Sequence, residues 1–240
     1  MKELPNHHSV VGNHDDGNTK AYTYEEDFVY GYLLAPEETS DIVRADHGLY
    51  YYIDVPVEKT RYLYLDTAAV PIMYDPVQTQ FLLDSLASTA EGWHIVVVAH
   101  IWYTVDYDNE FDSNMLLTDQ GRLVLELLDA YNSRSSGIAR VCKSTTDYSA
   151  VKLPYDFSQS VGKVEFCIGG HIHQDYDATS AQGIPVIHVD TDSYNTRSGL
   201  SAVAGTTNES CINGVIADYD ARKVTIVRIG RGESRIVPLQ

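Results

Sequence analysis

Two histidines that follow a pair of glycines are the first residues in this chain whose types and spacing could do chemistry. Val164 to Ile168 is a mostly apolar run typical of a buried strand, and Gly169-Gly170-His171-Ile172-His173 comes directly after it. Glycine lets the backbone turn sharply and approach a ligand closely, because it carries no Cβ. Imidazole nitrogens are common metal ligands. We therefore expect a candidate metal site at the carboxyl end of this strand, with a hydrogen-bonded scaffold role as the alternative for both histidines.

Two other predicted junctions between a strand and a loop deliver side chains of the same kind. Gly12-Asn13-His14-Asp15 follows a short apolar run, and the β-branched run Ile95 to Ala99 ends at His100. Histidine and asparagine side chains from three such junctions can converge on one site. The alternative for Asn13 is a left-handed turn residue, a conformation that asparagine tolerates.

In order, residue types and spacing, these three segments resemble the later motifs of the calcineurin-like metallophosphoesterase superfamily, which read GNHD, a histidine at a strand end, and GHxH. The resemblance implies a site for two divalent metal ions, drawn from manganese, iron, zinc or magnesium. It implies that Asn13, His100 and His171 bind the second metal ion and that His173 binds the first.

The same resemblance gives His14 and Asp15 catalytic roles. His14 would lie beside the phosphate, which it would stabilise or whose leaving oxygen it would protonate, and Asp15 would orient His14. Asn13 and His14 would also form the substrate-binding positions. The implied reaction is hydrolysis of a phosphomonoester or a phosphodiester by metal-activated water.

The chain departs from the family pattern at its beginning. The family has a D-x-H motif and a G-D motif ahead of GNHD, and neither stands between Met1 and Asn13. We expect a fragment of a longer enzyme, a start assigned too late, or a natural truncation. Because the absent motifs supply most of the first metal site and the bridging carboxylate, we expect one metal ion or none to be retained, with little or no activity. Candidate substitutes for the missing carboxylate are Asp15, Asp175, Asp190 and Asp192.

Two other functions stay open beside the enzymatic one. The chain could be a non-catalytic domain that keeps the fold and binds a ligand or a protein partner. It could also hold a single structural metal ion without chemistry. A sheet edge exposed by the absence of the first strands would be a template for pairing, so we also expect a homodimer through such an edge.

Composition narrows the classes of partner. The 240 residues carry a formal net charge of −17 and have a sequence pI near 4.7, which argues against binding to nucleic-acid backbones or anionic membranes. Apolar runs are too short for a membrane span, and no apolar segment opens the chain, so we expect a soluble, cytoplasmic protein. The three cysteines fit reduced thiols better than a disulfide framework.

The elements that must position the candidate ligands alternate between strands and helices along one domain, residues 1–240. This order, together with the resemblance, predicts an α/β (α+β) protein with a four-layer α-β-β-α sandwich that is incomplete at its N-terminus. Asp75-Pro76 is a helix start signal, an N-cap followed by proline at the first helical position. We expect helices at about 24–34, 76–89 and 116–131. We expect strands at 50–55, 61–66, 95–99, 164–168, 184–189, 211–217 and 223–229. We expect loop excursions around 35–48, 102–114, 134–162 and 192–210.

Overall fold

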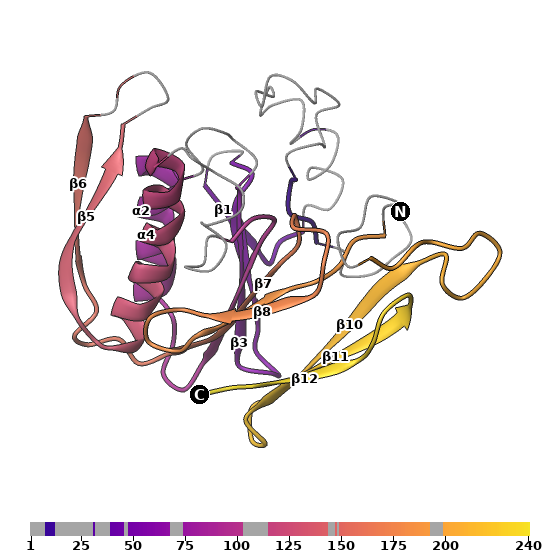
Figure 1. Cartoon of the computed structure of the whole chain (residues 1–240). Helices are drawn as coiled ribbons and strands as arrows, with labels where there is room; N and C mark the ends of the chain where they lie inside the picture. Colours follow the sequence, from indigo (N-terminus) through magenta and orange to yellow (C-terminus); the bar gives the residue numbers. More distant parts are fainter. Residues whose placement is uncertain are drawn as a thin grey trace.

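The apolar runs predicted as buried strands lie side by side in the centre of a seven-stranded sheet (Figure 1). The computed structural model describes residues 8–12, 31, 39–45, 48–67, 74–102, 115–143, 147, 149–192 and 199–240. The strand order is β1-β2-β3-β4-β7-β9-β8. The four central strands β3, β4, β7 and β9 are parallel to one another, whereas β1, β2 and β8 pair antiparallel. The bounds are β1 Ile42–Arg44, β2 Tyr51–Val55, β3 Thr60–Leu65, β4 His94–Ala99, β7 Lys163–Gly169, β8 Tyr176–Thr179 and β9 Pro185–His188.

One face of this sheet is covered by two helices, and a hairpin packs against the outer side of these helices (Figure 1). The helices are α2, Pro76–Ala87, and α4, Met115–Asn132, and the hairpin consists of β5, Ser136–Cys142, and β6, Ala150–Asp156. Helix α2 begins as predicted, because the Asp75 carboxylate accepts a hydrogen bond of 2.7 Å from the Gln78 amide. The largest hydrophobic cluster fills this side and includes Leu82, Val97, Leu128 and Phe157.

A second sheet covers the opposite face. It consists of β10, Cys211–Asp218, β11, Lys223–Gly230, and β12, Arg235–Pro238, in that order. Val224 and Ile226 of β11 pack with Val96, Phe166 and Ile187 of the large sheet. The side chains of a central strand point alternately into two apolar layers, so the whole strand is apolar in sequence. For this reason Ile95 to Ala99 could be recognised as a buried strand.

The described part of the chain is therefore a mixed α and β protein, broadly α+β, with a helical layer, a large mixed sheet and a smaller antiparallel sheet. Both described helices lie on the same side of the large sheet. The outer face of the smaller sheet carries exposed aliphatic side chains, namely Ile212, Ile216, Val227, Ile229 and Ile236.

Five of the described strands were not predicted. The expected loop at 35–48 contains the short strand β1, and the expected excursion at 134–162 contains the hairpin β5–β6, so both loop predictions were wrong there. The hairpin was missed because much of it is solvent-exposed: the residues of β6 alternate regularly between exposed and half-buried positions. The short strands β8 and β12 were also not predicted. Apart from residue 31, the predicted helix at 24–34 lies outside the described residues, and so does the excursion at 102–114 apart from Trp102.

All three cysteines lie in the described part, where they are buried and form no disulfide. Cys167 in β7 and Cys211 in β10 are small buried residues of these strands. None of the described helices is both long and apolar enough to cross a membrane.

Candidate metal centre

Two adjacent parallel strands place His100 and the GHxH segment at the same edge of the large sheet. Strands β4 and β7 are paired with Val98 opposite Ile168, so His100 and Gly170 follow their carboxyl ends together. The Gly170 amide donates a hydrogen bond of 3.1 Å to the His100 carbonyl. The carboxyl ends of parallel strands are where ligand sites form in open α/β sheets.

The side chains of His100 and His171 meet at this edge. His171 Nδ1 lies 3.3 Å from His100 Nε2, and the two rings are nearly perpendicular, with centroids 5.1 Å apart. Two nitrogens bound to one tetrahedral zinc ion at about 2.0–2.1 Å would lie roughly 3.3–3.4 Å apart, so this separation fits two ligands of one metal ion. It also fits a hydrogen bond between two neutral imidazoles.

No third ligand joins this pair within the described part of the chain. There, no three residues among His, Cys, Asp and Glu are grouped so that they could hold a metal ion. His173, two residues further on, is half-buried and does not complete such a group. Asn13, His14 and Asp15 lie outside the described residues. The preceding segment ends at Gly12, and its Val11 is buried against β2.

Gly169 and Gly170 were expected to make a sharp turn, but neither has a positive φ angle, and Gly169 instead provides space for close packing. A Cβ on Gly169 would lie 2.3 Å from the Ala99 carbonyl oxygen and 2.6 Å from Trp102 Cδ1, so glycine allows β7 to approach β4 closely. Trp102 is buried, and its indole Nε1–H donates a hydrogen bond of 2.9 Å to the Ile168 carbonyl. A Cβ on Gly170 would meet nothing within 4 Å.

The turn itself is made by the histidines. His171 and His173 have φ angles of 67° and 56°, in the left-handed region that few residues other than glycine adopt. Ile172 between them is buried, and its amide donates a hydrogen bond of 2.8 Å to the Gly170 carbonyl. These alternating conformations place both imidazoles in a short loop that leaves the sheet at its carboxyl edge.

A third histidine lies beneath this loop. His188 at the end of β9 is fully buried, its Nδ1 lies 3.5 Å from the Gly170 carbonyl oxygen, and its ring packs near Tyr176. Burial lowers the pKa of His188 to about 4, which keeps the imidazole neutral at neutral pH.

The candidate substitutes for the missing carboxylate are already engaged where the structure describes them. Asp175 accepts hydrogen bonds from Arg228 and Arg235. Asp190 accepts from the Thr191 amide, and Asp192 accepts from the Cys211 amide. The fourth candidate, Asp15, lies outside the described part.

Two features of this edge were missed in the sequence. Asp66 follows β3 directly and is buried next to the end of β4. Its backbone amide donates a hydrogen bond to the Gln78 side chain, and its backbone carbonyl accepts one from the same side chain. A carboxylate directly after an apolar run is the signal that could have found it. The arginines that bind Asp175 come from β11 and β12, and their spacing in the sequence carries no signal for this contact.

Comparison of the chain with models of known protein families and with curated proteins finds no match.

Proposed function

We propose that this chain carries part of the active site of a metal-dependent phosphoesterase that hydrolyses a phosphomonoester or a phosphodiester. The observation that carries the proposal is the approach of His171 Nδ1 to His100 Nε2, 3.3 Å apart at the carboxyl edge of two adjacent parallel strands. The residues of the GHxH and strand-end motifs are thus next to one another, although 71 residues separate them in the chain.

In this proposal His100, His171 and Asn13 would hold one divalent metal ion, and His173 would contribute to a second. Bound metal ions of this kind acidify water and neutralise phosphoryl oxygens. His14 would stabilise the phosphate or donate a proton to the leaving oxygen, and Asp15 would orient the His14 ring. These roles follow from the resemblance of the motifs.

We also propose the four-layer sandwich as the architecture of the complete domain. The exposed aliphatic side chains on the outer face of the β10–β12 sheet support it, because a sheet whose strands are apolar on both faces is normally covered on both. A dimer through a sheet edge also stays a proposal. The described edge strand β1 has only three residues, and short edge strands pair poorly with a second chain.

A non-catalytic domain that binds a ligand or a partner is the second candidate. The observation that favours it is that the described carboxylates Asp175, Asp190 and Asp192 are engaged in other contacts. A single structural metal ion is a third candidate, and in that case removal of metal should unfold the protein.

The test is hydrolysis of an aryl phosphate monoester and diester by the full chain, with and without Mn²⁺. We expect a low Mn²⁺-dependent rate that falls to background in His100→Ala and persists in His94→Gln. His94 is a matched control, because it begins the strand that ends before His100, and its Nδ1 binds Glu165 at 2.7 Å instead.

Hydrolysis that is unchanged in His100→Ala would contradict the proposal. A wild-type chain without any Mn²⁺-dependent rate would favour the non-catalytic domain. A high rate that requires His100 would support the function and refute the expectation of weak activity, since carboxylates elsewhere would then complete the site.

A further inference from the structure

The loop that carries His171 and His173 needs external support. Each histidine is in a left-handed conformation, which is unfavourable for a residue with a Cβ. Such conformations persist where surrounding contacts over-determine them. The first end of the loop is held by the Gly170 amide on the His100 carbonyl.

The second end of the loop is held by Asp175, two residues after His173. Both carboxylate oxygens of Asp175 accept hydrogen bonds from Arg228 Nη2, at 2.6 and 2.7 Å. Arg235 Nη1 binds Asp175 Oδ1 at 2.8 Å, and the Asp190 amide lies 3.2 Å from the same oxygen. Four donated hydrogen bonds thus converge on one carboxylate at the end of the loop.

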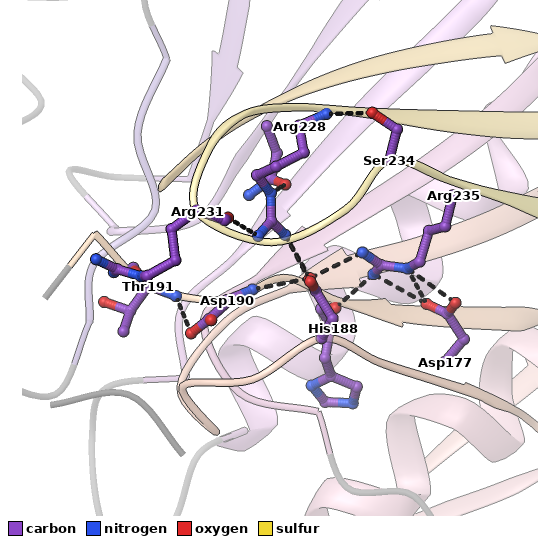
Figure 2. A network of polar contacts seen from close by, with 10 residues as sticks. Asp177, His188, Asp190, Thr191, Arg228, Arg231, Ser234 and Arg235 are labelled. Carbon is purple, nitrogen blue, oxygen red and sulfur yellow. Dashed lines mark hydrogen bonds and ion pairs between the residues drawn. The ribbon is translucent and has the colours of Figure 1, made fainter. Parts of the chain in front are cut away.

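Arg228 is itself held on every side. Its side chain is only 1% exposed, its Nε donates to Asn213 Oδ1 and its Nη1 donates to the Arg231 carbonyl. Figure 2 shows Arg228 and Arg235 reaching from the small sheet toward the strands that carry Asp177 and His188. A guanidinium fixed by contacts on two other sides can transmit the position of β11 to Asp175.

Arg235 makes a second connection between the same two sheets, but outside the loop. It binds both oxygens of Asp177 on β8 and donates to the His188 carbonyl. Asp177 and Asp175 thus both form an ion pair with Arg235, but Asp177 lies further along the chain from His173.

We propose that Asp175, held by Arg228, is a positioning residue that keeps His171 and His173 in their left-handed conformations. The small sheet would thereby set the geometry of the candidate metal ligands. The part of this inference that concerns metal affinity rests on the proposed function. The part that concerns loop order does not.

The experiment compares Asp175→Asn with Asp177→Asn, two isosteric changes that each remove one charge from the same network. In metal-free protein, we expect the amides of Gly170 and Ile172 to exchange with solvent at least about tenfold faster in Asp175→Asn, because exchange reports local opening. Exchange at these amides in Asp177→Asn should remain near that of the wild type.

Metal affinity is the second measurement. Changes to residues that orient metal ligands typically weaken binding about 10–100-fold, so we expect a loss in this range for Co²⁺ in Asp175→Asn and a much smaller one in Asp177→Asn. Equal amide exchange in Asp175→Asn and the wild type, or equal effects of both variants, would overturn the inference.

Two further outcomes are separable. If the wild type binds no Co²⁺, the proposed function fails, and amide exchange still decides the positioning role. If Asp175→Asn does not fold, Arg228→Lys keeps the buried charge but loses the fork geometry, and the same exchange measurement applies. Unchanged exchange in Arg228→Lys would then overturn the inference.

Discussion

At the residue scale, the candidate site consists of imidazoles in three different environments. His100 and His171 face one another, whereas His173, two residues later, belongs to no group of three potential ligands among the described residues. His188 is fully buried next to the loop and is kept neutral by its surroundings. Histidine therefore occurs as a half-buried pair at the edge of the sheet and as a neutral core residue beneath it.

The buried His188 predicts a pH dependence of stability. Its pKa is about 4 in the folded protein, against an ordinary value of 6.5, so the unfolded chain binds the proton more readily. The contribution of neutral His188 is complete above pH 6.5 and is lost as the pH falls toward 4. The loss is at most roughly 3 kcal/mol.

Urea unfolding between pH 4 and 7 measures this dependence. We expect the free energy of unfolding of the wild type to fall more steeply with decreasing pH than that of His188→Gln, which cannot take up the proton. Parallel pH dependences in the two proteins would show that burial of His188 does not control this part of the stability curve.

At the element scale, the approach of β7 to β4 brings the two histidine-bearing ends together. Gly169 permits this approach, and Trp102 closes the space beside it. The sequence indicated both strands, because each is an apolar run that ends in chemistry-bearing residues. It could not indicate that Gly169 serves packing while the left-handed turn falls on His171 and His173.

Matched alanine substitutions at the two glycines test this assignment. Gly169→Ala should lower the free energy of unfolding by roughly 1–3 kcal/mol or more, because its Cβ would overlap the Ala99 carbonyl and Trp102. Gly170→Ala should change it by only about 0.5 kcal/mol, since its Cβ would enter open space. Chemical denaturation of both variants decides the matter, and equal losses would contradict the packing role of Gly169.

At the scale of the whole molecule, much of the large sheet and both described helices were predictable, because long apolar runs and helix start signals depend on local sequence. The hairpin β5–β6 was not predictable in this way, since its exposed positions mix polar residues with apolar ones such as Ile138 and Ala150. The contact between Asp175 and Arg228 spans 53 residues and depends on how two sheets pack. No local pattern can reveal it.

The packing of the two sheets also links the candidate site to the rest of the protein. The large sheet supplies His100 and His171, and the small sheet supplies the arginines that hold the loop. The formal net charge of −17 would disfavour an anionic substrate in solution. Local positive charge from bound metal ions would therefore be needed at the site.

The most direct test of the central claim is a Co²⁺ titration of the full chain, followed by visible absorption. We predict a Co²⁺ band with histidine ligands in the wild type and in His94→Gln, and a loss of affinity of about tenfold or more in His100→Ala and in His171→Ala. A wild-type chain without this band, or one whose band persists unchanged in both alanine variants, would contradict the assignment of His100 and His171 as ligands of one metal ion.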